Sequence, residues 1–443
     1  MISFAQTYML NPKAREIWSD TATLQRWLDV EAALARAQAD LGMIPADAAR
    51  RITECARAES FDLARLSKAI AVAQHPLVPV LKDFVALCGE PAGGWIHWGA
   101  TTQNILDTAQ SLQLQAIADL VAADLHGTIS QLQARAREHA RTLQAGRTHG
   151  QHALPITFGF KLVYWSAEFE RHRSRLAHLC KTAFVARMGG AVGTYAAMRG
   201  RGREVEARLA SHIGLPCPGI GGRSDCDRQA EFVAFLGMVA ATCEKVANDL
   251  FFMQRTEIAE IEENHYAGRA GSSTMAQKRN PQEAQRVLML ARMTRSRVPL
   301  ALESMVRTEE GDAVSSHIMD YILPETGIFA SSAVQALREL LTQMKVHPDT
   351  MARNFRASGG LIMAEAVMMR LAVSIGRDQA HHLVHAAATE CAETGAAFPD
   401  AVRRHAQRCG VEARVITDDL FDPMNYLGEI GEIIAERAPA NMI

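Results

Sequence analysis

Two threonines, a glutamine and an asparagine follow one another in residues 96–109 (IHWGATTQNILDTA), just before a long apolar pattern begins. Hydroxyl and amide groups at the start of a helix add side-chain donors to free backbone N–H groups, and together they can bind a carboxylate. Thr101, Thr102 and Gln103 are therefore candidate carboxylate ligands. The alternative is a helix cap, a role that threonine and asparagine supply routinely, and the segment taken alone favours the cap.

A second polar segment, residues 146–159 (GRTHGQHALPITFG), carries two histidines three residues apart in a stretch marked by glycine and proline. Either His149 or His152 could carry a proton near neutral pH. Hydrogen-bonded structural histidines are the alternative, which these residues taken alone favour. A metal site is not expected, because no carboxylate or cysteine stands nearby at ligand spacing.

The third segment, residues 271–281 (GSSTMAQKRNP), holds two serines, a lysine and an asparagine. A serine such as Ser272 acts as a base only if nearby cations, amide donors and exclusion of water stabilise its alkoxide. Lys278 and Asn280 could hold a substrate carboxylate and stabilise the added charge of a carbanion. An exposed serine-rich loop explains the residues equally well. The fourth segment, residues 307–320 (RTEEGDAVSSHIMD), is charged and indicates a loop or a helix start.

Long helices are the elements that must position these segments. Between residues 112 and 140 apolar residues recur at steps of three or four, the spacing of one helix face, and further apolar runs cover 232–252 and 285–300. No alternating pattern bounded by hairpin turns is evident, so β-structure is not predicted. Several long helices without coiled-coil heptads predict an all-α bundle, and helices that are apolar on more than one side predict subunit association.

Two turn-rich breaks, at residues 88–94 (CGEPAGG) and 356–360 (RASGG), divide the 443-residue chain. A chain of this length exceeds what one compact core usually holds. We therefore expect an N-terminal helical domain over residues 1–93, a central long-helix domain over 94–357 and a C-terminal helical domain over 358–443. All four polar segments fall in the central domain.

The composition excludes several classes of protein. The chain is 48% hydrophobic and 22% charged with a net charge of −2, which is ordinary for a globular protein and unlike a nucleic-acid binder. The eight cysteines include no CxxC pair, so we expect free thiols in a reducing cytoplasm. The N-terminus has no secretory pattern, and no apolar stretch approaches the ~20 residues that span a bilayer, so no membrane association is expected.

In their order and separation, the four segments resemble the fumarase/aspartase superfamily across nearly the whole chain. Residues 29–45 (DVEAALARAQADLGMIP), 146–159 and 358–372 (SGGLIMAEAVMMRLA) resemble its branch of adenylosuccinate lyases and 3-carboxy-cis,cis-muconate cycloisomerases. The resemblance implies a three-domain all-α fold with a long central helical bundle. It implies a homotetramer with a twenty-helix core and active sites that are each built by three subunits. The implied reaction is reversible anti elimination from succinyl-type substrates, with no metal or organic cofactor.

The resemblance also assigns roles by position. Ser272 matches the catalytic base of the family. Lys278 and Asn280 match the groups that bind the carboxylate beside the abstracted proton. His75, in AQHPLVP, falls near a histidine that helps to protonate the leaving group in adenylosuccinate lyases.

Two further regions of the family bind substrate. Thr101, Thr102 and Gln103 match the first carboxylate-binding region. Thr148 and His149 match the second region, in which the histidine is a candidate acid or a substrate ligand.

The chain departs from the family pattern at several positions. Ala276 stands where family loops have proline, and Gln285 stands where lyases carry a glutamate that orients the histidine, so a charged His–Glu relay is not available. Gly311 and Asp320 stand where adenylosuccinate lyases have arginines that hold the nucleotide phosphate, so a nucleotide substrate is not expected. Cys226 stands where an Arg-Asp-Arg run is common.

The leading prediction is an enzyme that acts on a small polycarboxylate and reversibly eliminates an amine from an N-substituted aspartate. Within the family, the alternatives are epimerisation of an iminodisuccinate-like diacid and cycloisomerisation of a 3-carboxymuconate. A non-catalytic, crystallin-like protein is the least expected reading, because Ser272, Lys278 and Asn280 are all retained.

Overall fold

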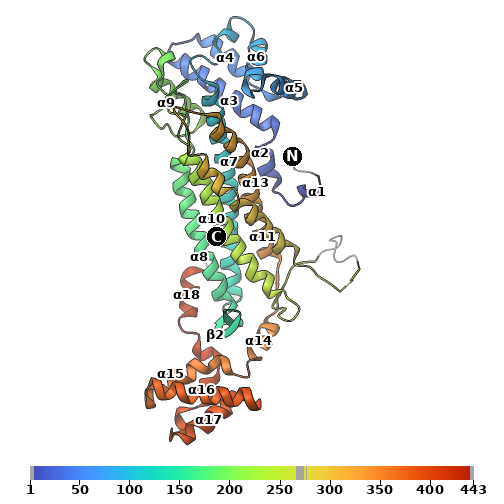
Figure 1. The fold of residues 1–443 in the computed structure, drawn as a ribbon, viewed down its shortest axis with the longest axis vertical. Helices are drawn as coiled ribbons and strands as arrows, with labels where there is room; N and C mark the ends of the chain where they lie inside the picture. Colours follow the sequence, from blue (N-terminus) through green and yellow to red (C-terminus); the bar gives the residue numbers. More distant parts are fainter. Residues whose placement is uncertain (1–3, 266–273, 276, 440–443) are drawn as a thin grey trace. The chain divides into compact units, whose positions relative to one another are not determined.

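The computed structural model describes residues 4–265, 274–275 and 277–439, and helices make up most of that length (Figure 1). The chain forms two compact units. Unit 1 comprises residues 1–126, 171–245 and 286–337, and unit 2 comprises residues 127–170, 246–285 and 338–443. The observed fold is the all-α fold that the sequence predicts. The three-domain division stays a prediction, although helices end close to both predicted breaks, at Cys88 and Arg356.

The N-terminal helices are α1 (Phe4–Thr7), α2 (Pro12–Ile17), α3 (Asp20–Asp40), α4 (Ala46–Cys55), α5 (Leu63–Ala73) and α6 (Leu77–Cys88). The next helices are α7 (Thr102–Glu138), α8 (Phe158–Thr182), α9 (Gly202–Ile213), α10 (Asp227–Met253), α11 (Gln282–Arg295), α12 (Val298–Glu303) and α13 (Ala313–Gln343). The C-terminal helices are α14 (Pro348–Arg356), α15 (Ala364–Ile375), α16 (Arg377–Thr394), α17 (Phe398–Arg408) and α18 (Ile430–Arg437). The strands are β1 (Leu143–Thr148), β2 (Gln151–Thr157), β3 (Ile261–Glu262) and β4 (Lys345–Val346).

The predicted long helices are present. The apolar stripe of residues 112–140 lies almost wholly within α7, where Leu114, Ile117 and Val121 are buried in unit 1. Each such side chain contributes about 1.5–3 kcal/mol when it leaves water. The run that opens at Phe232 lies in α10. The charged fourth segment ends in the first turns of α13, which begins at Ala313, as its composition suggested.

The predicted run of residues 285–300 is not one helix, which corrects the sequence analysis. α11 ends at Arg295, and α12 begins at Val298 with a proline in its first turn. Pro299 has no backbone N–H with which to continue an i→i−4 ladder, so it fits best in the first turn of a helix, where it lies in α12. The hydroxyl of Ser296 donates to the carbonyl of Met293 at 2.9 Å in this break.

β-Structure was not predicted, yet the second polar segment lies largely in an antiparallel hairpin of β1 and β2. Thr148 pairs with Gln151, so His149 and Gly150 form the turn. Their φ angles are +52° and +77°, the left-handed pair that a tight hairpin turn requires. The usual sequence signal for this turn is Asn-Gly or Asp-Gly, and His-Gly does not carry it, which explains the omission.

Each unit has its own core. In unit 1, α3 packs against α4 and α9, and Ser19 caps α3 by accepting the N–H of Ala22 at 3.2 Å. In unit 2, α16 packs between α15 and α17 around an apolar cluster that includes Leu371, Ala387 and Phe398 (Figure 1).

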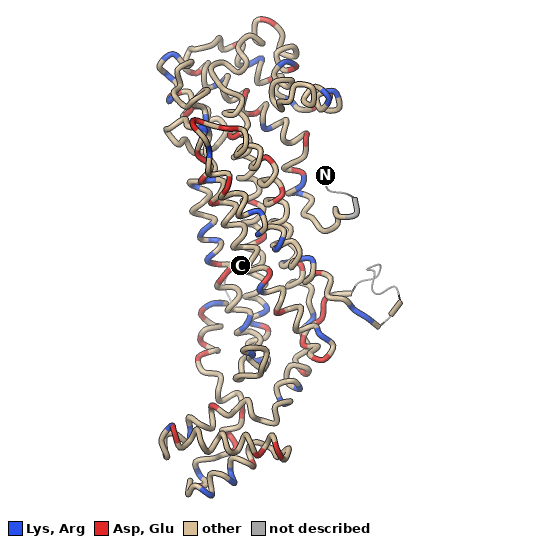
Figure 2. Tube along the Cα trace, viewed as in Figure 1, with Lys and Arg blue, Asp and Glu red and all other residues tan. Residues whose placement is uncertain are grey.

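Charged residues of both signs are spread along the helices, with no long stretch of one sign (Figure 2). Among the described residues no single helix is long and apolar enough to cross a membrane. One bent pair, α14 with residues 361–375, meets that test of length and composition together, with an angle of 79° between its parts.

Candidate active site

His75 and Thr102 come together in unit 1. Nε2 of the His75 ring lies 3.3 Å from Oγ1 of Thr102. Thr102 is the first residue of α7, and His75 directly precedes Pro76 at the start of α6. The fold thus brings two segments that the sequence linked separately to substrate binding into direct contact.

Backbone amides fix the tautomer of the His75 ring. Its Nδ1 accepts the N–H groups of Leu77 and Val78, at 3.1 and 3.3 Å, so the proton of the neutral ring lies on Nε2, the atom that faces Thr102. Burial, and then the neighbouring His97 ring, lower the pKa of His75 below its usual range. His75 is therefore a neutral hydrogen-bond donor at neutral pH and not an imidazolium.

The residues that start α7 are tied down by Asn104. Its Oδ1 accepts the N–H groups of Thr101 and Gly190, at 3.2 and 3.0 Å, and the residue is fully buried. Asn104 thus supplies the structural role at the helix start that the sequence analysis gave as the alternative for this segment. Thr101, Thr102 and Gln103 stay partly exposed. Their side chains can reach a ligand at the positive end of a long helix.

Gln103 is held by a carboxylate that the sequence analysis missed. Its Nε2 donates to Oδ1 of Asp107 at 2.6 Å, one turn along α7. Burial raises the pKa of Asp107, although the charge of Arg187 and the bond from Gln103 act in the opposite direction. This bond uses one of the two N–H donors of Nε2 and holds the Gln103 amide in place, and the second donor is left for a ligand. No signal in the sequence set Asp107 apart, because it precedes the apolar stripe of residues 112–140.

Three arginines contribute positive potential at Asp107. Arg187 makes two bonds to the carboxylate of Asp225, at 2.9 and 3.2 Å, and its side chain is almost wholly buried. Arg307 and Arg223 also act on Asp107 through their charges. These charges offset part of the cost of ionising the buried Asp107.

In unit 2, the hairpin carries Thr148 and His149 at its tip. Both side chains are exposed, and both lie at or next to the left-handed turn. Histidine occupies this backbone region more readily than most non-glycine residues do. The turn therefore presents the imidazole outward, away from the unit 2 core.

Strand β1 of the hairpin is held by Glu260, a second carboxylate that the sequence analysis missed. Arg147 binds both of its oxygens, at 2.5 and 3.2 Å, and Gln144 and Asn354 donate to it at 2.7 and 3.1 Å. Burial alone would raise the pKa of Glu260, but the bonds from Arg147 and Gln144 lower it overall. Glu260 lies in an acidic run (EIAEIEEN), where a solvated surface is the ordinary reading, so its type gave no signal of burial.

The serine loop is described only in part. Ser272 and Ala276 lie outside the described residues, whereas Lys278 is exposed and Asn280 is partly buried. Where the loop ends, the carboxylate of Glu263 accepts the N–H groups of Glu283 and Ala284, both at 2.9 Å, and so caps α11. This cap fixes the point at which the loop returns to the core.

The structure describes two of the positions at which the chain departs from the family pattern. Gln285 is exposed on the first turn of α11. Gly311 has a φ of +151°, and a Cβ there would lie 2.7 Å from Nε of Arg223, so the Arg223 side chain occupies the space next to this glycine. The described residues contain no group of three or more histidine, cysteine or acidic side chains that could hold a metal ion.

A cavity of about 290 Å³ lies in unit 1 next to Pro76, the residue that follows His75. Pro76, with Leu106 and Gln110 on the first turns of α7, forms part of its wall. Trp27 and Asp320 are among the residues of the other walls. No motif in the sequence pointed to this cavity.

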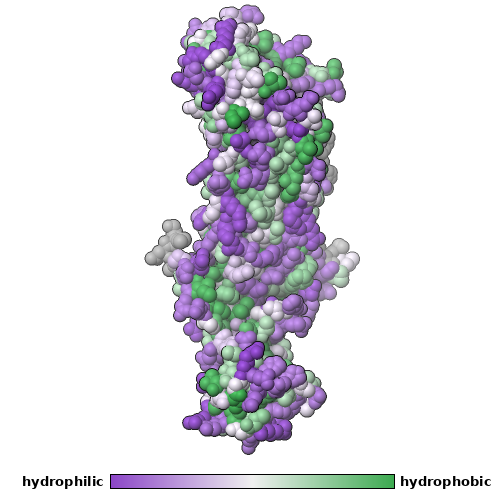
Figure 3. Space-filling model, turned by 60° about the vertical axis from the view of Figure 1, so that its left-hand side comes forward, coloured by the Kyte–Doolittle hydropathy of each residue, from purple (hydrophilic) through white to green (hydrophobic). Residues whose placement is uncertain are grey.

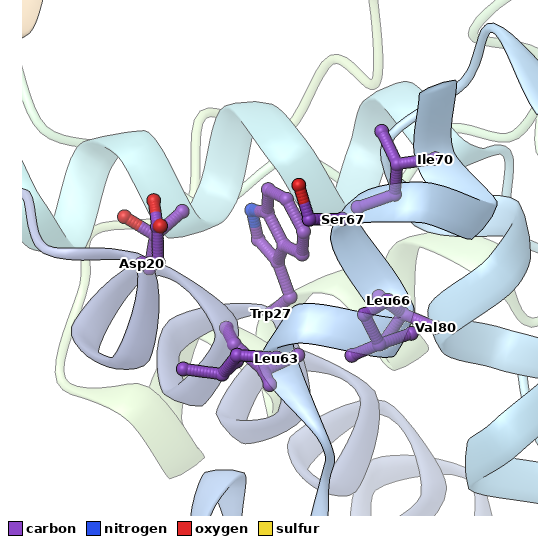
Figure 4. Close-up of a pocket in the computed structure, with 9 residues that line it drawn as sticks. Asp20, Trp27, Leu63, Leu66, Ser67, Ile70 and Val80 are labelled. Atoms are coloured by element: carbon purple, nitrogen blue, oxygen red, sulfur yellow. The ribbon is translucent and has the colours of Figure 1, made fainter. Parts of the chain in front are cut away.

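A second cavity of about 160 Å³ lies in unit 1 between α3 and α5. Figure 4 shows the Trp27 ring between Asp20 and the apolar side chains Leu66 and Ile70 of α5. Trp27 lines both cavities and so forms a wall between them. This second cavity contains none of the residues predicted for the site.

Comparison with known proteins places these features in a family. Residues 7–295 match the family model described as "Lyase", and residues 360–437 match "Adenylosuccinate lyase C-terminus". The chain belongs to the fumarase/aspartase superfamily. As a member of this superfamily, it is an enzyme with the fold that the sequence predicts.

Several relatives show the range of this superfamily around the chain. The N-acetyl-S-(2-succino)cysteine lyase of Enterococcus italicus is 37% identical over 425 residues, which cover 95% of this chain and 93% of that protein. The 3-carboxy-cis,cis-muconate cycloisomerase of Bradyrhizobium diazoefficiens is 37% identical over 417 residues, which cover 94% and 92%. A solved fumarate lyase structure from Mesorhizobium sp. BNC1 matches 98% of each chain, with a TM-score of 0.89 and 35% identity. Relatives of similar identity thus include both a succinyl-type lyase and a cycloisomerase.

Proposed function

We propose that this enzyme reversibly eliminates an amine from an N-substituted aspartate. In the proposed reaction Ser272 removes a proton from the carbon beside one carboxylate. The C–N bond then breaks, its electron pair leaves with the nitrogen, and fumarate and an amine are formed. Lys278 and Asn280 are assigned to the carboxylate that takes up charge when the proton leaves.

The observation that carries this proposal is the polar group at the start of α7. Thr101 and Thr102 supply hydroxyls, His75 supplies an Nε2–H, and the start of α7 supplies the positive end of a long helix. A substrate carboxylate can accept from several of these donors. The group is held in place by Asn104 and Asp107 before any ligand arrives, which lowers the entropic cost of binding.

The leaving group separates two candidate substrates. An amine must gain a proton as it leaves, whereas a thiol, with a pKa of about 8.5, leaves more easily as an anion. His75 is a neutral donor, and Gln285 carries no charge, so neither is a strong acid. A succinyl thioether is therefore the second candidate. The similarity to a lyase named for N-acetyl-S-(2-succino)cysteine supports it further.

A homotetramer with active sites shared between subunits is part of the proposal. Large apolar side chains are exposed on α10 to α13 in unit 1, and Figure 3 shows apolar patches among hydrophilic ones on one face. These exposed side chains are Met238, Met289, Met293, Leu300, Leu302, Val314 and Tyr321. Apolar surface of this kind is typical of a protein contact. Light scattering on the purified protein should give four times the mass of the 48.4 kDa chain.

A panel of reactions tests the proposed function. Purified enzyme is incubated with fumarate and an amine, with fumarate and a thiol, and separately with 3-carboxymuconate, and the products are followed by absorbance and NMR. We expect C–N bond formation from fumarate and an amine. Cycloisomerisation of the muconate alone, or thioether formation alone, would replace the proposal by the corresponding alternative. An intact oligomer that turns over none of them would favour a non-catalytic protein.

A further inference from the structure

We propose that the 290 Å³ cavity beside His75 binds the distal end of the leaving group and selects a positively charged tail, with Asp320 as its ionic partner. This inference rests on the proposed function, because it assigns the part of the amine that does not react. The matching substrate is an N-substituted aspartate derived from a diamine, with the second amine protonated.

The position of the cavity fits this role. Its wall includes Pro76, next to His75, and Leu106, which follows Thr102 by one turn of α7. Gln110 lies one further turn along the same helix. A substrate whose carboxylate lies at the first turn of α7 can therefore extend its other end along this helix into the cavity.

Asp320 supplies a negative charge that the described residues do not balance with a lysine or arginine. Nε2 of Gln110 donates to its Oδ1 at 2.7 Å, and the nearest ionisable nitrogen recorded for it is Nδ1 of His317, at 3.5 Å from Oδ2. Burial raises the pKa of Asp320, and the charge of Asp107 acts in the same direction, whereas His317 lowers it. The Asp320 side chain is 46% exposed, so an ammonium group in the cavity can reach its carboxylate, and its positive charge favours the ionised form.

The remaining walls fit the rest of such a tail. Trp18, Trp27 and Pro324 line the same cavity with aromatic and aliphatic surface. Indole faces attract cations, and the attraction grows as water is excluded. An alkylammonium ion matches this combination, because its methylene groups contact the apolar wall and its charged end meets the carboxylate.

Two arginines define the rival ligand. Arg307 donates through Nη2 to Ser316 at 3.0 Å, one turn of α13 before Asp320. Arg223 lies against Gly311 nearby in the same unit. A tail that ends in a carboxylate would exploit these guanidinium groups instead of Asp320. The charge of the preferred tail therefore decides between the two readings.

The experiment measures addition to fumarate by three amines. They are ethylenediamine at a pH where one amine is protonated, propylamine with a neutral tail, and β-alanine with an anionic tail. In each reaction the neutral nitrogen forms the C–N bond, the neighbouring carbon gains a proton, and the nitrogen loses one. We expect the highest kcat/KM for ethylenediamine and the lowest for β-alanine.

The variant Asp320→Asn keeps the size and hydrogen bonding of the side chain but removes its charge. We expect the preference for ethylenediamine over propylamine to fall by roughly tenfold, because the ammonium group loses its charged hydrogen-bond partner. Activity with propylamine should stay within about twofold. Glu325→Gln is the matched control: it removes the same charge from α13 at a residue that pairs with Arg297 and does not line the cavity.

Equal rates with ethylenediamine and propylamine, or a preference unchanged in Asp320→Asn, would overturn the inference while leaving the proposed function intact. A preference for β-alanine would transfer the role to Arg223 and Arg307. If no amine adds to fumarate, the proposed function fails. Calorimetric titration with ethylenediamine alone then decides: saturable binding that Asp320→Asn weakens supports the cavity assignment, and its absence rejects it.

Discussion

The predicted site residues of unit 1 and unit 2 are held in different ways. In unit 1 the predicted residues are partly buried. Hydrogen bonds hold the His75 ring, the backbone of Thr101 and the amide of Gln103 in place. In unit 2, the hairpin tip and Lys278 are exposed. The elements that carry these residues are fixed: Glu260 binds strand β1, and Glu263 caps α11.

The difference separates binding from reaction. A carboxylate receptor gains from rigidity, because ordering is then complete before the ligand arrives. Reactive groups that are exposed on one chain can be covered later, by substrate or by another subunit. We therefore expect unit 1 residues to set binding, and unit 2 residues to set the chemical step or the stability of the elements that carry it.

The largest effect is expected from the serine loop. Ser272→Ala should lower kcat by roughly 10²–10⁴-fold, the contribution typical of a positioned base. The adjacent Ser273→Ala is the control and should keep most of the activity. Steady-state kinetics on oligomers of unchanged mass measures both. A Ser272→Ala enzyme with near wild-type turnover would remove this residue from the mechanism.

The second effect concerns the ion pair between Arg147 of strand β1 and Glu260. Glu260→Gln leaves Arg147 without its ionic partner and should lower the free energy of unfolding by about 3 kcal/mol. Thermal and denaturant unfolding measure the loss. Glu257→Gln, an exposed residue of the same segment, should change stability by less than about 0.5 kcal/mol. Similar losses in the two variants would show that the Arg147–Glu260 pair does not anchor the hairpin.

This contribution of Glu260 depends on pH. Because its pKa is lowered in the folded state, the stabilisation is complete above the unfolded-state pKa of about 4.3 and is lost as pH falls through the folded value. The gap between wild type and Glu260→Gln should therefore be widest at neutral pH and should shrink in acid. A gap that widens in acid would contradict the assignment.

The third effect tests the neutral His75. His75→Ala should lower kcat/KM by roughly 10²-fold, the effect of removing one positioned donor, whereas His75→Gln keeps an N–H and should lose less. Protonation of the wild-type ring would set a new N–H against the amides of Leu77 and Val78. Wild-type kcat/KM should therefore fall as pH drops below about 6.5, and this decline should be absent in His75→Gln. A wild-type rate that rises in that range would indicate an imidazolium acid instead.

The smallest effect separates structure from chemistry at the hairpin tip. His149→Asn suits the left-handed turn and should change stability by less than about 0.5 kcal/mol while lowering kcat. His149→Val, which resists positive φ, should cost about 1–2 kcal/mol. Melting temperatures and kinetics distinguish the two variants. If His149→Asn keeps full activity, His149 has no role in the chemical step.

The sequence was sufficient for the long helices and for the polar segments, because apolar periodicity and rare residue combinations are local signals. The break before α12 was also readable, since Pro299 disfavours a continuous helix, but the apolar run concealed it. The hairpin was missed because His149-Gly150 lacks the usual turn signal.

The two supporting carboxylates could not be found in this way. Asp107 and Glu260 have the same residue type as many solvated carboxylates. Their roles come from burial and from partners far along the chain, such as Arg147, which is 113 residues from Glu260. The cavity that contains Asp320 likewise combines residues from four separate stretches, which no local pattern relates.

Proton abstraction beside a carboxylate is the central claim, and solvent-isotope labelling tests it most directly. An N-substituted aspartate is incubated in D₂O with wild type and with Ser272→Ala, and NMR follows the carbon-bound hydrogens. We predict that wild type forms fumarate and returns deuterium stereospecifically to the recovered substrate, and that Ser272→Ala does neither. Deuterated diacid of inverted configuration without free fumarate would mean epimerisation. Carbon-bound hydrogens that stay unexchanged in every dicarboxylate tested, with the wild-type oligomer intact, would contradict the account.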